Sequence, residues 1–191
     1  MTSYHGWLIQ APPPHRQPVA AVRESCERDL PAIADIYARH VTCGLASFEE
    51  VPPTVSELRT RRAAVLDAHL PYLVAELDGE VVGYAYASGY RARSAYRYTI
   101  EDSVYVADGM RGRGVGGTLL AALLERCDTG PWRQMLAVIG DSDNAASIAL
   151  HRRYGFERVG TFTAVGFTLG RWVDTVLMQR ALGSGARGAP R

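Results

Sequence analysis

A glycine- and arginine-rich segment carries the clearest chemical signal in this 191-residue chain. It runs from Arg111 to Thr118, reads RGRGVGGT, and lies between a predicted strand and a run of leucines at helical spacing. Backbone N–H groups at the start of a helix have no partners within the helix, and the helix dipole adds positive charge there. Glycines let an anion approach the backbone, and the arginines add charged donors. The segment is therefore suited to bind a pyrophosphate.

Several interpretations of this segment compete. A P-loop ends in Gly-Lys-Ser/Thr, and the segment has no lysine. The dinucleotide pattern GxGxxG matches residues 112–117, with Asp141 downstream as a possible ribose partner, but its first glycine should follow the strand more closely. The acyl-CoA pattern Arg/Gln-x-x-Gly-x-Gly/Ala matches Arg111, Gly114 and Gly116. A glycine turn that only opens a helix is the structural alternative.

Three further segments favour the acyl-CoA interpretation. They are residues 29–33 (DLPAI), residues 98–106 (YTIEDSVYV), and residues 144–151 (NAASIALH) followed by YGF at 154–156. With them the chain resembles the GNAT superfamily of acetyl-CoA-dependent N-acetyltransferases over about residues 22–182. More narrowly, it is similar to the phosphinothricin and methionine sulfone/sulfoximine acetyltransferase group.

The resemblance implies an α/β fold with a single GNAT-type acyltransferase domain, in which a mixed, mostly antiparallel sheet is flanked by helices. In this family two sheet strands separate to form the cleft for acetyl-CoA, the co-substrate, and no metal is expected. The residues expected to contact acetyl-CoA are Val104, Tyr105, Val106, Arg111, Gly112, Arg113, Gly114, Val115, Gly116, Gly117, Thr118, Asn144 and Ser147. Asn144 could also cap the following helix, and the two roles are compatible.

Glu101 is the candidate general base. An ammonium group must lose a proton before it attacks a thioester, and a carboxylate can take that proton directly or through water. The resemblance aligns Glu101 with the base proposed for the phosphinothricin-type enzymes, while an exposed strand carboxylate without a catalytic role is the alternative. Because side chains alternate along a strand, only one of Glu101 and Asp102 is expected to face the cleft.

The other catalytic groups are less well determined by the sequence. A backbone N–H near Val106 is the family expectation for stabilising the oxyanion. Many GNAT enzymes carry a tyrosine four residues before the Gly-Phe pair, but this chain has His151 there, as the phosphinothricin group does. Either His151 or Tyr154 could protonate the leaving thiolate, or neither is needed. A structural role for His151 is equally compatible with the sequence.

The acceptor site is expected around the segment that precedes the candidate base. Two arginines two positions apart can bind a carboxylate, phosphinate or sulfone, and neighbouring aromatic residues can form the walls of a small pocket. The expected substrate-binding residues are Phe48, Arg91, Arg93, Tyr96 and Thr99. A solvated basic loop and a buried core phenylalanine are the alternatives.

Residues 166–174 (GFTLGRWVD) follow the family's pattern in outline and usually join the dimer interface and the pocket. Thr168 replaces the usual lysine, which leaves the choice of acceptor open. The resemblance implies a homodimer.

Hydrophobic periodicity predicts the elements that position these residues, in the order β α α β β β α β α β β. A capping box, Thr54 to Glu57, opens the second helix, and Asp78-Gly79 is a hairpin turn. Residues 19–182 should form the domain, after a Pro-rich extension at 1–18 and before a flexible tail at 183–191.

Composition agrees with an ordinary globular protein, since 47% of the residues are hydrophobic and 21% are charged. The net charge of +1 gives no overall field for nucleic acid or an anionic membrane. Three cysteines without a CxxC pattern indicate a reduced, cytoplasmic protein. No apolar run approaches the ~18 residues of a membrane span, and the N-terminus is not a secretory signal.

The sequence thus predicts an N-acetyltransferase that transfers acetyl from acetyl-CoA to the amino group of a small amino-acid-like acceptor. Phosphinothricin and methionine sulfone or sulfoximine are the model acceptors. The amine would attack the thioester directly, with Glu101 as base, so no cysteine is needed as a nucleophile. The alternatives are a catalytically silent acyl-CoA-binding sensor and a GNAT enzyme that acts on a polyamine or a protein amine.

Overall fold

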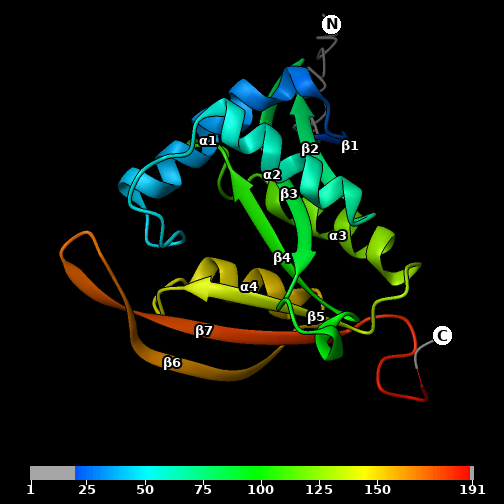
Figure 1. Ribbon diagram of the computed structural model, residues 1–191. Helices are drawn as coiled ribbons and strands as arrows, with labels where there is room; N and C mark the ends of the chain where they lie inside the picture. The colour runs from blue at the N-terminus through cyan, green and yellow to red at the C-terminus, as the bar shows by residue number, and fades with distance from the viewer. Residues whose placement is uncertain (1–19, 190–191) are drawn as a thin grey trace, which may run out of the picture.

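One seven-stranded sheet organises the computed structural model of the chain, which describes residues 20–189 (Figure 1). The strand order is β1-β2-β3-β4-β5-β7-β6. The strands are β1 (Ala21–Glu24), β2 (Tyr72–Leu77), β3 (Glu80–Gly89), β4 (Thr99–Val106), β5 (Gln134–Gly140), β6 (Glu157–Thr168) and β7 (Arg171–Ala181). The helices are α1 (Leu30–Cys43), α2 (Val55–Asp67), α3 (Val115–Asp128) and α4 (Ala145–Arg153), with short 3-10 turns η1 (Glu27–Asp29) and η2 (Ser94–Tyr96). The predicted order of helices and strands and the mixed sheet are confirmed.

The local sequence signals act as expected. The Thr54 hydroxyl accepts a hydrogen bond from the Glu57 backbone N–H at 3.2 Å, and the Glu57 carboxylate accepts one from the Thr54 backbone N–H at 2.6 Å. This reciprocal pair opens α2. At the β2–β3 turn Asp78 and Gly79 both have positive φ, 52° and 85°, as a type I′ hairpin requires.

The sheet separates between its two central strands. β4 and β5 are parallel and pair only from Thr99 with Gln134 to Asp102 with Ala137. Beyond that point β4 stays paired with β3 up to Val106, and β5 stays paired with β7 up to Gly140. Since all the other strand pairs are antiparallel, this single parallel pair is where two halves of the sheet meet and diverge, as the family resemblance implies.

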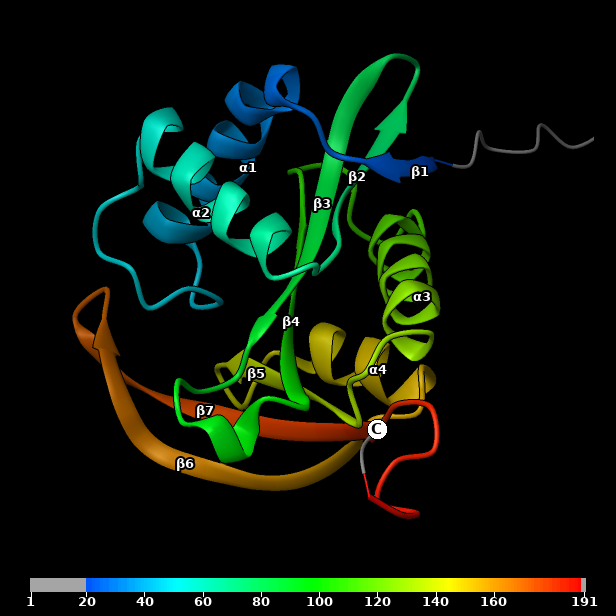
Figure 2. The same cartoon turned by 45° about the vertical axis from the view of Figure 1, so that its right-hand side comes forward.

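Helices cover both faces of the sheet. Figure 2 shows α1 and α2 on one side and α3 and α4 on the other. Helix α3 packs on β2, β3 and β4 through Leu119, Leu120 and Leu123, which are fully buried. The apolar spacing of this helix predicts that Cys127 belongs to the core, and Cys127 is buried on this face. The start of α3 is thereby fixed over the end of β4.

Several element boundaries differ from the prediction. The sequence pattern predicts a loop over residues 41–53 and strands over residues 156–164 and 172–179. Helix α1 instead extends to Cys43, and β6 and β7 form a longer hairpin over residues 157–168 and 171–181. Long β-strands at a sheet edge depend on pairing with each other, which local periodicity does not reveal. The predicted extension at 1–18 lies outside the described residues. Residues 183–189 form turns, with the Gly183 N–H donating to Asp128, and the flexibility of the tail stays a prediction.

Within residues 20–189, no helix is long and apolar enough to cross a membrane. The same part of the chain contains no group of three or more His, Cys, Asp or Glu residues placed to hold a metal ion.

Candidate active site

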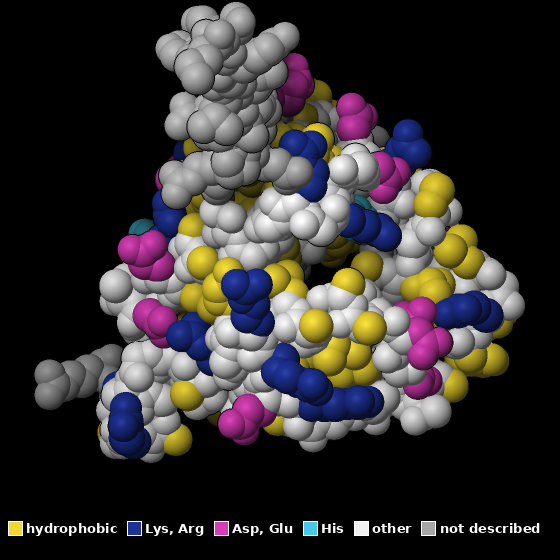
Figure 3. All heavy atoms as spheres, turned by 180° about the vertical axis from the view of Figure 1, so that it is seen from behind, with side chains coloured by type: hydrophobic (Ala, Val, Ile, Leu, Met, Phe, Trp, Pro, Cys, Tyr) yellow, Lys and Arg dark blue, Asp and Glu magenta, His cyan; other side chains and the backbone are white. Residues whose placement is uncertain are grey.

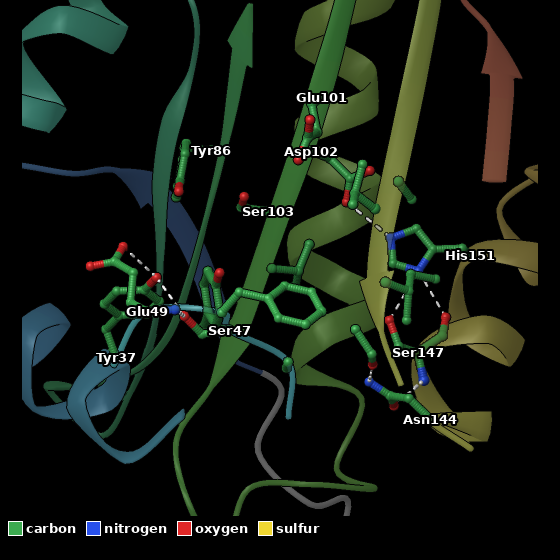
Figure 4. Close-up of a pocket in the computed structure, with 18 residues that line it drawn as sticks. Tyr37, Ser47, Glu49, Tyr86, Glu101, Asp102, Ser103, Asn144, Ser147 and His151 are labelled. Atoms are coloured by element: carbon green, nitrogen blue, oxygen red, sulfur yellow. Dashed lines mark hydrogen bonds and ion pairs between the residues drawn. The ribbon is translucent and has the colours of Figure 1, made fainter. Parts of the chain in front are cut away.

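A cavity of about 420 Å³ opens where β4 and β5 diverge. Its walls come from residues 101–105 of β4, residues 137–140 of β5, residues 46–49 of the loop after α1, and the first turns of α4 (Figure 4). Seen from behind, the molecule is hollowed at its centre, with basic and apolar side chains around the opening (Figure 3). The separation of the strands therefore creates the site.

Of the residues expected to hold acetyl-CoA, four line the cavity (Val104, Tyr105, Asn144 and Ser147), while Val106 and residues 111–118 lie outside its lining. Val104 and Tyr105 line the cavity on the part of β4 that has separated from β5. The backbone N–H and C=O groups of successive residues point to opposite edges of a strand, so those of every second residue here point toward the gap. Gly116, at the start of α3, faces this strand: a Cβ there would be 3.5 Å from a Val106 methyl carbon. The strand and the glycine-rich segment thus adjoin.

The glycine-rich segment owes its form to its glycines. Gly112 and Gly114 have φ values of +75° and +82°, and Gly114 is the N-cap of α3. Such conformations are costly for residues with a Cβ. Nothing lies within 4 Å of the position a Cβ would take at either glycine, so the backbone stays open to approach. Arg111 and Arg113 are exposed beside it.

The start of α4 forms another wall. The Asn144 side-chain oxygen accepts a hydrogen bond from the Ser147 N–H at 3.2 Å, so Asn144 is the N-cap of α4. Asn144 and Ser147 also line the cavity. The capping role of Asn144 is therefore confirmed, and the residue is placed where a ligand contact is also possible.

Glu101 lies at the point where the two strands part, and its half-buried side chain lines the cavity. Burial, together with the charge of Asp102, raises the pKa of the Glu101 carboxyl to about 7. A carboxyl group with a pKa near neutrality can both accept and release a proton under ordinary conditions. Glu101 therefore has the protonation behaviour that a general base needs.

Asp102 also lines the cavity, which corrects the expectation that only one of the two carboxylates would do so. The separation of β4 from β5 exposes the edge of β4 as well as one of its faces. Asp102 is buried and lies 2.9 Å from the Nε2 atom of His151. The two adjacent carboxylates consequently have different surroundings.

The histidine and tyrosine expected near the leaving group occupy different places. Both ring nitrogens of buried His151 are engaged, Nε2 with Asp102 and Nδ1 with the Ser147 carbonyl oxygen at 2.8 Å. Burial alone would lower the pKa of His151, but these hydrogen bonds and the Asp102 charge outweigh it and raise that pKa. Tyr154 lies outside the cavity lining, with its hydroxyl next to Gly117 of α3.

The loop after α1 closes the cavity from the other side. Phe48 lines the cavity and is 41% exposed, which excludes the alternative of a buried core phenylalanine. Beside it, Glu49 accepts a hydrogen bond from the Tyr37 hydroxyl at 2.9 Å and two from Arg61, at 2.6 and 3.1 Å. Tyr37, Ser47, Glu49 and Tyr86 are cavity residues that the sequence reasoning missed. They lie in three separate elements, and no local pattern marks them.

The structure does not bring the other expected acceptor residues into the cavity. Arg91, Arg93 and Tyr96 are exposed in the segment between β3 and β4, and Thr99 begins β4. The Arg91 guanidinium carbon lies 4.9 Å from the centre of the Tyr90 ring and 5.7 Å from that of Tyr96. None of these residues is part of the cavity lining.

Comparisons with known proteins agree with this geometry. The model of the acetyltransferase (GNAT) family matches residues 33–156. The chain is 57% identical to a phosphinothricin N-acetyltransferase from Alcaligenes faecalis, over 90% of each chain. It is 42% identical to an L-methionine sulfoximine/L-methionine sulfone acetyltransferase from Pseudomonas paraeruginosa, over 84% of this chain and 93% of the relative.

A solved structure has the same fold. It is the crystal structure of a GNAT superfamily phosphinothricin acetyltransferase from Sinorhizobium meliloti in complex with AcCoA. The two chains superpose with a TM-score of 0.88 at 44% identity, covering 91% of this chain and 94% of the other. The chain belongs to the acetyltransferase (GNAT) family of acetyl-CoA-dependent N-acetyltransferases, within the group that contains the phosphinothricin and methionine sulfoximine acetyltransferases.

Proposed function

We propose that the protein transfers acetyl from acetyl-CoA to the amino group of a small amino-acid-like acceptor of the phosphinothricin and methionine sulfoximine or sulfone type, with Glu101 as the general base. The observation that carries this proposal is a half-buried carboxyl group with a pKa of about 7, at the point where β4 and β5 part. The names of the relatives support the acceptor class.

The reaction follows from the charges in the cavity. Glu101 removes one proton from the acceptor's ammonium group, and the neutral amine attacks the thioester carbonyl carbon. Backbone N–H groups on the unpaired side of β4, near Val106, stabilise the resulting oxyanion. When the C–S bond breaks, coenzyme A leaves as a thiolate and takes up a proton, and the amide nitrogen loses its second proton.

The acetyl-CoA side of the cleft is proposed to follow the expected set. Val104, Tyr105 and Val106 would bind the pantetheine arm, the segment from Arg111 to Thr118 would bind the pyrophosphate, and Asn144 and Ser147 would contact the arm from α4. The open space beside Gly112 and Gly114 supports this assignment, because phosphate oxygens could reach the backbone donors there. Since both nitrogens of His151 are engaged and Tyr154 lies outside the cavity, neither residue is proposed as the proton donor to the thiolate.

The acceptor is proposed to enter between Phe48 and Glu101. Glu49 and Glu101 give this part of the cavity a negative character that suits an ammonium group, and Phe48 and Tyr86 are apolar walls for a short side chain. Arg91 and Arg93 stay proposed contacts for the anionic end of the acceptor. Because they lie outside the lining within one chain, they would act at its rim or in a site completed by another copy.

A homodimer is proposed as the working form. The β6–β7 hairpin exposes large apolar side chains, of which Phe167 and Trp172 are 56% and 65% exposed and pack edge to face at 5.2 Å. A contiguous apolar surface of this kind is typical of an interface. Size-exclusion chromatography with light scattering should give twice the chain mass, and a monomer at all concentrations would contradict the dimer.

The proposal is tested by measuring thiol release from acetyl-CoA with a panel of acceptors. The panel contains phosphinothricin, methionine sulfone, methionine sulfoximine, methionine, a polyamine and a lysine peptide. Fast turnover of the first three is expected, with kcat lowered by a factor of about 10²–10⁴ in Glu101→Gln. Turnover of the polyamine or the peptide alone would overturn the acceptor class. Tight binding of coenzyme A without turnover would indicate an acyl-CoA sensor instead.

A further inference from the structure

A buried polar pair lies directly behind the proposed base. Asp102 follows Glu101 on β4, and its side chain is 2% exposed while that of His151 is 5% exposed. Figure 4 shows the dashed contact between them crossing from β4 to α4, with Glu101 above. The proposed reaction does not use either residue, so the position of this pair needs its own explanation.

The hydrogen bonds determine how many protons the pair holds. The Ser147 carbonyl oxygen can only accept, so the Nδ1 atom of His151 carries a hydrogen. The 2.9 Å contact between His151 Nε2 and Asp102 Oδ2 then contains one more proton. Whether this proton is on nitrogen or on oxygen, the pair as a whole is neutral. The other oxygen of Asp102, Oδ1, is buried and has no hydrogen-bond partner within residues 20–189.

A buried carboxylate without a cation is strongly unfavourable, and two carboxylates that share a site cannot both ionise freely. If His151 were absent, Asp102 and Glu101 would be two neighbouring acids in one cleft. We propose that His151 is a positioning residue that acts through Asp102: the proton that the two residues share keeps the pair neutral as a whole, so that Glu101 alone gains and loses a proton during acetyl transfer. This inference rests on the proposed role of Glu101 as base.

The other titratable groups near the two carboxylates are consistent with a neutral Asp102–His151 pair and a Glu101 that alone exchanges a proton. From β3, Tyr86 is held neutral because burial raises the pKa of its hydroxyl. From the loop after α1, Glu49 stays ionised because its hydrogen bonds with Arg61 of α2 lower its pKa. From α3, Cys127 stays a thiol because burial, helped by the charges of Asp128 and Asp102, raises its pKa to about 12. Around neutrality, therefore, none of these three groups changes its charge. The Asp102–His151 pair is the neighbouring group whose proton affects the pKa of Glu101.

The test compares pH profiles of kcat/KM at saturating acetyl-CoA, because a purely structural role would lower activity without moving the profile. Asp102→Asn keeps the shape and can still donate a hydrogen bond to His151, but it removes the carboxylate, which is the end of the neutral pair next to Glu101 on β4 and whose charge raises the pKa of Glu101. The acidic limb should move to lower pH, by about one pH unit. His151→Gln leaves Asp102 without its cation, so the limb should move to higher pH. In the double variant the limb should match that of Asp102→Asn.

The control is Glu24→Gln. Glu24 lies on β1, at the far edge of the sheet, and the substitution removes its carboxylate from an exposed ion pair with Arg126 of α3. Its limb should stay where the wild-type limb is. The proposal is overturned if the two single variants move the limb in the same direction, or if neither moves it.

A second readout separates this proposal from the one it rests on. The carboxyl carbon of Glu101, labelled with ¹³C, can be titrated by NMR in each folded variant and assigned with Glu101→Gln. Opposite shifts of its titration midpoint would support the pair's role even if Glu101 were not the base, in which case Glu101→Gln would retain full kcat. Unchanged midpoints in both single variants would overturn the pair's role while leaving the base assignment intact.

Discussion

Two loops border the cleft, and different physical features hold them in place. The cofactor loop, residues 107–114, precedes α3. Its shape depends on backbone conformations that glycine adopts easily, with φ values of +78°, +75° and +82° at Gly109, Gly112 and Gly114. Nothing lies within 4 Å of the Cβ position at any of the three. This loop therefore depends on its own residues and presents bare backbone.

The acceptor loop, residues 44–54, is held by side chains from elsewhere. Tyr37 of α1 and Arg61 of α2 both bind Glu49. The Phe48 ring occupies the space where a Cβ would lie at Gly166 of β6, and the Leu45 carbonyl occupies the corresponding space at Gly140 of β5. Contacts with four other elements, α1, α2, β5 and β6, therefore determine the position of this loop.

The comparison separates two kinds of specificity. Under the proposed function the cofactor loop binds one invariant group, a pyrophosphate, for which backbone donors are sufficient. The acceptor loop must fit a variable side chain, and contacts with distant elements allow that fit to change without altering the loop itself. Substitutions should therefore affect acetyl-CoA binding when they are local to the first loop, and acceptor binding when they are remote from the second.

Among the substitutions that test the two loops, the largest effect is expected at Gly114. Gly114→Ala forces a side chain into the left-handed region, at a cost of about 1–2 kcal/mol. If the loop leaves its binding conformation as a result, KM for acetyl-CoA should rise about tenfold while KM for the acceptor stays constant. Initial rates with each substrate varied in turn measure both constants.

Gly170→Ala is the matched control, because Gly170 has a φ of +75° in the β6–β7 turn and the same open space around it. It should lower stability by a similar amount in a denaturant titration and leave KM for acetyl-CoA unchanged. Equal KM changes in both variants would mean that general destabilisation, rather than the shape of the cofactor loop, controls binding.

A smaller effect is expected at Gly166, far from the acceptor loop in sequence. The methyl group of Gly166→Ala would collide with the Phe48 ring. The ring must rotate away, because the backbone of Gly166 is held by the pairing of β6 with β7. KM for the acceptor should rise about fivefold with KM for acetyl-CoA unchanged, since roughly 1 kcal/mol of wall contact is lost.

Gly160→Ala, also on β6 but with nothing within 4 Å of its Cβ position, is the control for the added methyl group. Combining Gly166→Ala with Phe48→Leu should restore part of the acceptor affinity, because the smaller side chain relieves the collision. If KM for the acceptor is higher in the double variant than in either single variant, a collision with the Phe48 ring is not the cause of the Gly166→Ala effect.

The same contrast explains what the sequence could predict. The order of elements and the separated strands could both be inferred, the first from local periodicity and caps and the second from the family resemblance. The glycine-rich segment is marked by its glycine spacing, and Glu101 lies in a contiguous motif that carries the resemblance. The folded structure confirms the first two and places Glu101 in the cavity. What these residues do in catalysis stays a prediction.

The acceptor side could not be predicted as well. Tyr37 looks like an ordinary core position of α1, and it does pack on Tyr105, yet its hydroxyl also reaches Glu49. Arg91 and Arg93 looked like pocket residues because they precede Glu101, but the segment between β3 and β4 leaves them exposed. Contacts between residues far apart in the chain leave no local pattern, and sequence proximity to Glu101 does not place Arg91 and Arg93 in the cavity lining, so their role stays a prediction.

A third effect tests the hydrogen bonds of the acceptor loop. Tyr37→Phe removes the hydroxyl that donates to Glu49 and lies 3.0 Å from the Ser47 hydroxyl, but it keeps the ring packed on Tyr105. The free energy of unfolding should fall by about 1 kcal/mol, and KM for the acceptor should rise two- to threefold. Urea titration and initial rates measure the two quantities. An unchanged acceptor KM would show that the loop does not need this bond.

The smallest effect is expected at Arg61, whose ion pair with Glu49 has side chains 49% and 34% exposed. Exposed ion pairs contribute less than about 1 kcal/mol and weaken with salt. Arg61→Met, which keeps an apolar stem, should change KM for the acceptor by less than about twofold, and the change should vanish in high salt. If Arg61→Met instead raised KM for the acceptor as much as Gly166→Ala does, and high salt abolished this large change, charge rather than shape would hold the acceptor loop. The two loops would then differ in the source of their contacts but not in how precisely those contacts must fit.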